Sequence, residues 1–276
     1  MCQVCPRLLP VEASIQMKVV IVGCGPAGLA AAHAAYGLDC EVVIYAPKKM
    51  TPQMGPLLIQ RPIPGINTDH PDGTIHQIVI GGSILDYRYK LYGDINIGIN
   101  GDILQPNYHA WDHRETYEKL WKLYHFLIRD QEVSPFSLSL LHERADLVVS
   151  TANASKMCLD RGRHSFRSAS VAITEAAEYP KQPWNTIIFN AGDEYRWVRS
   201  SNIWGSTVTE WLTDSAPDSA RVIIKPISTD CNCYPHVLRT GRFGAWRNET
   251  WVDTAYNDTY TAITSMIRHD ELDRIK

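Results

Sequence analysis

The sequence predicts an α/β fold: a Rossmann-like, doubly wound domain that carries a small β-rich subdomain. A strand, a glycine-rich turn, a helix and a second strand follow one another near the start of the chain. Short segments rich in β-branched residues fill the second half, and a late strand leads into a glycine turn and a last helix. This order is typical of a nucleotide-binding sheet with inserted segments that cover a ligand.

The first of these observations is the most specific. The turn Gly23-Cys-Gly-Pro-Ala-Gly28 stands between a β-branched segment and an Ala-rich helix that Gly37 ends. Gly23 permits the tight turn, Gly25 lets a pyrophosphate approach the backbone, and Gly28 lets the helix pack closely on the strand. The helix N-terminus then faces the phosphates. The turn predicts dinucleotide binding, with strands over residues 18–22 and 40–45 and a helix over 29–36.

One expected part of such a site is missing. A carboxylate usually ends the second strand, about 20 residues past the glycines, and binds the ribose. Here the strand ends in Ala46, and Glu41 lies at its start. The ribose contact is therefore absent, made by backbone, or supplied elsewhere. Lys48 and Lys49 could instead bind the 2′-phosphate of NADP, although charged residues at a solvated strand end are the more ordinary interpretation.

The remaining elements follow from periodicity and turn residues. We expect a β-hairpin around Gly81-Gly82, and a capping box at Asp112-His-Arg-Glu115 that opens an amphipathic helix to about Arg129. The domains predicted are an N-terminal extension (1–16), a nucleotide-binding domain (17–165 and 236–276) and a β-rich substrate subdomain (166–235). Further strands are expected at 75–80, 83–89, 145–151, 170–174, 186–191 and 221–226, a strand or short helix at 206–213, and a helix near the C-terminus.

Composition narrows the function classes. The chain of 276 residues is 45% hydrophobic with a net charge of −3, which excludes disorder as its main state. It has no apolar run of membrane-spanning length, and its charge balance favours neither nucleic acid nor a membrane as partner. Seven scattered cysteines without a signal peptide indicate the cytoplasm. No Gly-x-Ser-x-Gly or phosphate-loop motif supports a hydrolase or a kinase.

Two motifs carry a resemblance to known flavoproteins. Val22-Gly-Cys-Gly-Pro-Ala-Gly-Leu29 resembles the FAD-binding start of the glutathione-reductase-like superfamily. Thr240-Gly-Arg-Phe-Gly-Ala-Trp246 resembles that superfamily's closing motif, and Arg242 within it is similar to UDP-galactopyranose mutase and its amine-oxidase-like relatives. The missing acid at Ala46 departs from the superfamily pattern.

Other strings resemble small, mostly phage-encoded flavoproteins known only as oxidoreductases, so that the likeness extends from Met17 to about Arg268. They are Arg61-Pro-Ile-Pro-Gly65, Tyr92-Gly93, Ala110-Trp111-Asp112, Tyr195 through Arg199, and Lys225-Pro-Ile-Ser-Thr-Asp-Cys231. The resemblance implies FAD as cofactor and NAD(P)H as a candidate reductant.

The cofactor site is expected at the carboxyl edge of the sheet, where ligands bind in such folds. Arg242 would neutralise phosphate or stabilise a reduced flavin anion, unless it is an ordinary surface arginine. The cofactor-binding residues predicted are Gly23, Gly25, Pro26, Ala27, Gly28, Ala46, Thr151, Ala152, Gly241 and Arg242.

The substrate and catalytic candidates are Tyr195, Arg199 and His109. Strict alternation would place Tyr195, Trp197 and Arg199 on one face of a strand, where an aromatic–cation surface could hold a nucleotide or sugar phosphate. A sheet face packed on its neighbour is an equal alternative. His109, His113 and His236 are candidate acid–base groups, because histidine is the residue type whose ordinary pKa lies near neutrality, although each alone is more often structural.

The cysteines give a weaker signal. Cys2-Gln-Val-Cys5 and Cys231-Asn-Cys233 have zinc or redox spacing and could together hold a zinc ion, but four unrelated thiols are the more ordinary interpretation. Cys158 has no role that the sequence suggests. We therefore predict no metal ligands.

Three functions remain open. The first is an FAD-dependent oxidoreductase acting on a small polar metabolite or nucleotide-like substrate. The second is a non-redox flavoenzyme similar to the sugar-nucleotide mutases. The third is a dinucleotide-binding protein without catalytic activity. The missing carboxylate at Ala46 leaves this possibility open.

Overall fold

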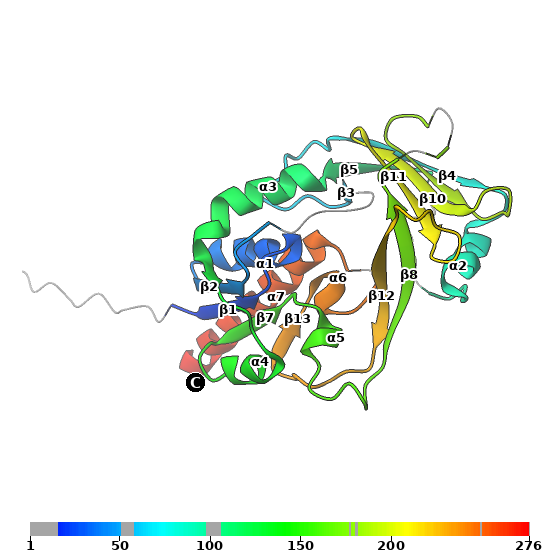
Figure 1. Ribbon diagram of the computed structural model, residues 1–276. Helices are drawn as coiled ribbons and strands as arrows, with labels where there is room; N and C mark the ends of the chain where they lie inside the picture. The colour runs from blue at the N-terminus through cyan, green and yellow to red at the C-terminus, as the bar shows by residue number, and fades with distance from the viewer. Residues whose placement is uncertain are drawn as a thin grey trace, which may run out of the picture.

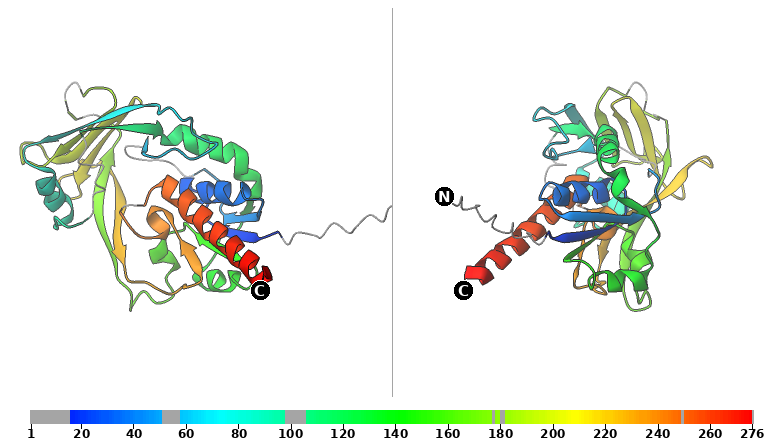
Figure 2. Two further views of the ribbon diagram at one scale, coloured as in Figure 1. Left: turned by 180° about the vertical axis from the view of Figure 1, so that it is seen from behind. Right: turned by 90° about the vertical axis from the view of Figure 1, so that its left-hand side faces the viewer.

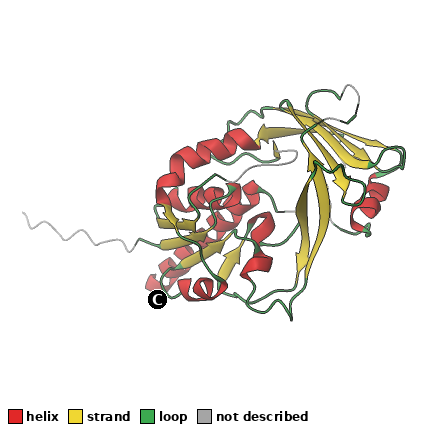
Figure 3. Ribbon diagram, viewed as in Figure 1, coloured by secondary structure: helices red, strands yellow, loops and turns green. Residues whose placement is uncertain are grey.

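The computed structural model describes residues 16–50, 58–97, 106–176, 178–179, 182–248 and 250–275. Its strands form a five-stranded sheet near the N- and C-terminal segments and an eight-stranded sheet beside it (Figures 1 and 3). The α/β fold class with a Rossmann-like domain and a β-rich subdomain is confirmed. The predicted extension lies almost wholly outside the described residues, as do Cys2 and Cys5.

The five-stranded sheet is parallel throughout, as a Rossmann-like sheet requires. Its order is β13-β7-β1-β2-β6, so that the first strand lies in the middle. The strands are β1 (Lys18–Val22), β2 (Glu41–Ala46), β6 (Ile128–Asp130), β7 (Leu147–Ser150) and β13 (Val237–Arg239).

Both faces of this sheet are covered. Val19 and Ile21 of β1 point into a buried cluster with α1 (Pro26–Tyr36), α3 (His113–Tyr124) and α7 (Val252–Ile275). Val20 and Val22 point to the other face, against α4 (Pro135–Leu141) and α5 (Ala154–Met157). The sheet is therefore doubly wound, and its strands are apolar on both sides. Figure 2 shows α7 running beside α1 and on past the sheet edge.

The eight-stranded sheet has the order β12-β8-β11-β10-β9-β4-β5-β3 and is antiparallel except between β4 and β9. It takes strands from two parts of the chain, one between β2 and β6 and the other between β7 and β13. They are β3 (Leu58–Ile59), β4 (Gly73–Ile80), β5 (Asn107–Asp112), β8 (Phe166–Thr174), β9 (Thr186–Asn190), β10 (Trp197–Ile203), β11 (Ser206–Leu212) and β12 (Arg221–Thr229). The strands of the predicted subdomain, 166–235, thus pair with strands from an inserted segment.

Two sequence predictions about elements are wrong. Residues 83–89 form no strand: α2 (Ile84–Tyr92) begins there, because Ser83 and Asp86 make a reciprocal capping box and Gly93 ends the helix with a φ of +66°. The helix predicted to reach Arg129 ends at Tyr124. A short 3-10 turn (His125–Leu127) and strand β6 follow it.

No helix within the described ranges combines the length and the apolar character that crossing a bilayer demands.

Candidate functional site

Three strand ends meet at the carboxyl edge of the Rossmann-like sheet. The turn after β1 begins at Gly23, the segment after β7 at Thr151, and the segment after β13 at Thr240. The Thr151 backbone N–H donates to the Val22 carbonyl at 2.9 Å, and the Thr240 N–H donates to the Ser150 carbonyl at 3.1 Å. These bonds extend the parallel pairing past the strands and hold the three turns side by side.

The glycines of the first turn are required by space as well as by conformation. Gly23 has a φ of +109°, which L side chains rarely adopt. A Cβ on Gly28 would lie 1.9 Å from the Gly23 carbonyl oxygen, so α1 packs directly on the turn. Gly241 packs in the same way, because a Cβ there would lie 2.6 Å from that of Ala27. The predicted residues Gly23, Ala27, Gly28, Thr151 and Gly241 therefore form one contiguous surface.

The N-terminus of α1 opens onto this surface. Gly25 is its N-cap residue with φ −68° and ψ 178°, Pro26 stands in the first turn, and no side chain caps the helix. The turn is held from its other side: the Cys24 thiol donates to the Pro47 carbonyl at 3.3 Å and the Tyr117 hydroxyl to the Cys24 carbonyl at 3.2 Å. An uncapped helix start of this kind suits a phosphate group.

The end of β2 has an acid beside it, although not in the expected position. Ala46 is buried and pairs with Asp130 at the end of β6. One Asp130 carboxylate oxygen accepts the Lys48 backbone N–H at 3.0 Å. A carboxylate thus lies at the sheet edge next to the place where the ribose partner usually stands. The sequence did not reveal it, because Asp130 was expected just beyond a helix.

The second part of the site is a buried charge cluster on the eight-stranded sheet. Arg199 of β10 and Lys225 of β12 both bind the carboxylate of Glu210 on β11, with Lys225 Nζ 2.5 Å from Oε2. The side chains of Glu210 and Lys225 are 1% and 4% exposed, so water screens neither charge.

The pKa values in this cluster follow from its charge count. Burial alone would raise the pKa of Glu210, but Arg199 and Lys225 outweigh it and lower that pKa to about 2. Burial and the charge of Arg199 lower the pKa of Lys225 to about 7, in spite of Glu210. The single carboxylate of Glu210 is therefore the counter-ion of both cations.

A third cation extends the cluster toward the Rossmann-like domain. Arg242 stands in α6 (Gly241–Gly244), directly after the Gly241 turn, and it donates to the Asn248 side-chain oxygen at 2.9 Å. Burial lowers its pKa, as does Arg199, while Tyr92 and Glu210 act in the opposite sense. Its Nε and the Nε of Arg199 are shielded from solvent, and neither has a partner among the described residues. Arg242 thus links the Gly241 turn to the charge cluster.

The expected face shared by Tyr195, Trp197 and Arg199 does not exist. The pairing of β10 with β11 shifts between Trp197 and Arg199, so strict alternation fails there. Trp197 packs with Tyr195 in one apolar cluster, with ring centroids 5.1 Å apart. Arg199 lies opposite Phe189, which belongs to the cluster on the other face.

The candidate histidines stay apart from one another. His109 is exposed on β5, with Nδ1 3.4 Å from the Thr74 hydroxyl. His113 is buried, and burial lowers its pKa to about 4, which keeps the ring neutral near pH 7. His236 stacks on His142 at a centroid distance of 5.7 Å.

Glu210, Lys225 and Asp130 were not predicted as site residues. A signal for Glu210 existed in the sequence, because a single acid between Thr209 and Trp211 in the strand Ser206–Leu212 needs a partner when the strand is buried. Which cation would meet it depended on strand order, which the sequence did not specify.

No family model matches the chain, and no curated protein matches its sequence. Solved structures do match. MibH, a tryptophan 5-halogenase, aligns over 94% of this chain and 68% of its own with a TM-score of 0.54 at 12% identity. A fatty acid isomerase from P. acnes aligns over 90% of this chain and 98% of its own, with a TM-score of 0.50 at 11% identity. A flavoprotein/dehydrogenase from Cytophaga hutchinsonii aligns over 88% and 75%, with a TM-score of 0.48 at 11% identity. At such identities the first two likenesses show a shared fold.

Proposed function

We propose that the protein is an FAD-dependent enzyme of the oxidoreductase type that acts on a small polar, anionic substrate. The observation that carries this proposal is the contiguous surface of Gly23, Gly28, Thr151 and Gly241, with Arg242 leading from it to a buried cationic cluster. Its fold is shared with an enzyme named as a halogenase and one named as an isomerase.

The described residues fit FAD at this surface. Bound FAD would supply the redox chemistry of its isoalloxazine ring. The backbone of Gly23, Gly25 and Gly28 would hold the pyrophosphate, with Pro26, Ala27, Thr151 and Ala152 lining the site. Asp130 would take the ribose role that Ala46 lacks. Arg242, through the unpartnered Nε, would donate to a phosphate or to the flavin and stabilise its reduced anion.

The excess of positive charge indicates the substrate class. Arg199, Arg242 and, in its protonated form, Lys225 are three cationic groups around the single carboxylate of Glu210. Buried charge without a counter-ion is costly, so the cluster favours an anion beside it. The cofactor could supply part of the negative charge that balances the cluster, and an anionic group on the substrate could supply the rest. Arg199 is thus the predicted catalytic-site residue with most support, while Tyr195 and His109 stay predictions.

The first test is the visible absorption spectrum of the purified protein, with the released cofactor identified by mass. We expect flavin bands, FAD on denaturation, and bleaching by NAD(P)H or dithionite. Turnover that needs a reductant without consuming it would favour the mutase-like alternative. A colourless protein that takes up no added FAD would overturn the proposal and favour binding of another nucleotide.

Replacing Gly25 by valine should weaken FAD binding without unfolding the protein. The φ and ψ of Gly25 are open to any residue, but the side chain would occupy the path of the pyrophosphate. We expect FAD affinity to fall by about 100-fold or more, a loss of about 3 kcal/mol. Titration of the apoprotein measures this, and unaltered affinity would contradict the assignment.

Replacing Arg242 by methionine should make the bound flavin harder to reduce, because a cation that stabilises the reduced anion is removed. We expect a more negative reduction potential and weaker binding of FAD. The control is Arg221→Met, since Arg221 is exposed at the start of β12. Equal potentials for the two variants would show that Arg242 does not act on the flavin.

A further inference from the structure

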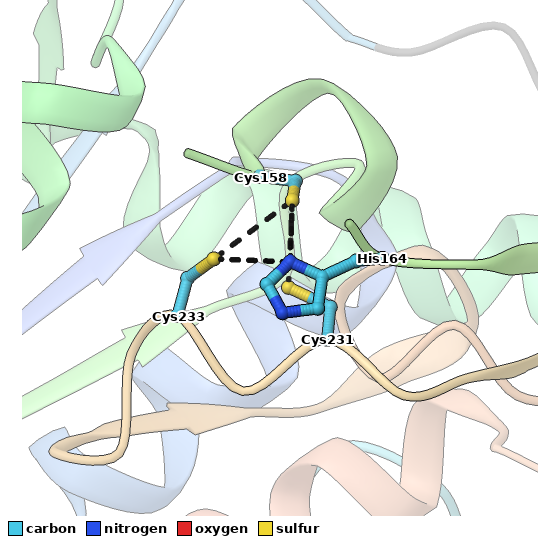
Figure 4. Close-up of side chains that lie close together, drawn as sticks. All are labelled: Cys158, His164, Cys231 and Cys233. Atoms are coloured by element: carbon cyan, nitrogen blue, oxygen red, sulfur yellow. Dashed lines mark hydrogen bonds between the residues drawn. The ribbon is translucent and has the colours of Figure 1, made fainter. Parts of the chain in front are cut away.

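Four metal-ligating side chains meet away from the glycine turn, at the base of the eight-stranded sheet. They are Cys158, His164, Cys231 and Cys233, and their ligand atoms all lie within 4.8 Å of one another. Figure 4 shows Cys158 and His164 on one stretch of chain, and Cys231 and Cys233 on another that faces it. Cys158 and Cys231 are buried, while His164 and Cys233 are partly exposed.

The spacing within the cluster matches tetrahedral coordination. The Cys158 sulfur lies 3.7 Å from that of Cys231 and 3.8 Å from that of Cys233. His164 Nδ1 lies 3.3 Å from the Cys158 sulfur and 3.6 Å from the Cys233 sulfur. A tetrahedral zinc ion with bonds of about 2.3 Å to sulfur and 2.0 Å to nitrogen places sulfurs about 3.8 Å apart, and sulfur and nitrogen about 3.5 Å apart. A disulfide would need about 2.05 Å between sulfurs.

We propose that Cys158, His164, Cys231 and Cys233 bind a structural zinc ion. Three thiolates and one imidazole are a common ligand set of structural zinc sites, and four protein ligands leave no open position for a substrate. Thiolate ligands also select against magnesium and calcium, which prefer oxygen.

Backbone N–H groups of the same loop face two of these sulfurs. Those of Leu159 and Asp160 donate toward the Cys233 sulfur, and that of Asp160 also donates toward the Cys158 sulfur. Metal-bound thiolates commonly accept such bonds, which orient the sulfur and stabilise its charge. The short loop between Cys158 and His164 therefore supplies two ligands and part of their outer shell.

The location of the cluster gives the ion a role. The chain leaves the Rossmann-like domain after α5, passes Cys158 and His164, and enters β8. It returns from β12 through Cys231 and Cys233 into β13. Two hydrogen bonds join the two crossings on the side of β8 and β12: the Ser165 N–H donates to Asp230 at 2.7 Å, and the Thr229 hydroxyl donates to the Ser165 carbonyl at 2.8 Å. Zinc would hold the two crossings together and so fix the position of one sheet relative to the other.

The decisive measurement is the metal content of the full-length purified protein by mass spectrometry. We expect about one zinc ion per chain. Exchange for cobalt should give the visible and near-ultraviolet bands of a tetrahedral thiolate site, and a chelator should lower the melting temperature by about 5 °C or more. Less than about one-tenth of a zinc ion per chain, with no cobalt spectrum, would overturn the proposal.

Variants identify the ligands. Cys158→Ser and Cys233→Ser should each lose the ion, whereas His164→Cys should keep it with a four-thiolate cobalt spectrum. Cys40→Ser is the matched control, because Cys40 is a buried thiol outside the cluster. The paired change Cys2→Ser and Cys5→Ser tests the rival ligand set that the sequence suggested. Loss of zinc in that variant, with retention in Cys158→Ser, would refute the assignment. The metal content of the unaltered protein tests the proposal even where a variant fails to fold.

Discussion

Replacing Gly28 by alanine is expected to lower the free energy of unfolding by about 3 kcal/mol or more and to abolish FAD retention. The added Cβ would lie 1.9 Å from the Gly23 carbonyl oxygen, and the obstacle is backbone that no rotamer change can move. Helix α1 would have to shift away from the turn, which would also displace its N-terminus from the pyrophosphate. Urea unfolding of the apoprotein and flavin content after purification measure the two effects.

The matched control for this change lies at the other end of the same helix. Gly37 has a φ of −67°, which alanine adopts freely, and a Cβ there would meet the His33 carbonyl oxygen at 3.3 Å. We expect Gly37→Ala to change the stability by no more than about 1 kcal/mol and to leave FAD bound. If both variants lost the same stability, glycine content in general, and not close packing at Gly28, would be the cause.

Replacing Glu210 by glutamine should lower the free energy of unfolding at pH 7 by about 3–5 kcal/mol. Glu210 is the partner of both Arg199 and Lys225, so its removal leaves Arg199 without a counter-charge and takes away the carboxylate that favours the protonated form of Lys225. Lys225→Met is the control within the same cluster. It keeps the Arg199–Glu210 pair and removes one cationic group, so its cost should stay within about 1 kcal/mol. Equal losses in the two variants would contradict the charge argument.

At acid pH, the difference in the free energy of unfolding between the wild type and Glu210→Gln should become smaller. The folded-state pKa of Glu210, about 2, lies below its ordinary 4.5, so the ionised carboxylate stabilises the fold. That contribution is complete above pH 4.5 and is lost as the pH falls through 2. Urea unfolding at pH 7 and pH 3 should therefore show a smaller gap at pH 3. A constant gap would mean that Glu210 acts through packing and not through charge.

The sequence by itself determined the first strand–turn–helix–strand unit of the Rossmann-like sheet. The segment from Lys18 to Tyr45 specifies its strand, turn and helix locally, because glycine spacing, β-branched residues and an alanine-rich helix act over neighbouring positions. For the same reason the turn at Gly23, Gly25 and Gly28 could be predicted, as could the final turn at Gly241. Hydrophobic pattern alone misassigned residues 83–89, since the Ser83–Asp86 capping box outweighed their strand-like composition.

The tertiary structure decided what depends on contacts between distant segments. The strand order set which cations meet Glu210, and the register shift before Arg199 separated that residue from Tyr195. Pairing of β2 with β6 brought Asp130 beside Ala46. The Cys158–His164 loop meets the Cys231–Cys233 loop only because the crossing from β7 to β8 lies beside the crossing from β12 to β13. The partners are separated by 11 residues for Arg199 and Glu210 and by 73 residues for Cys158 and Cys231, and they lie on different strands or loops. No local pattern encodes the distance between side chains that the fold brings together.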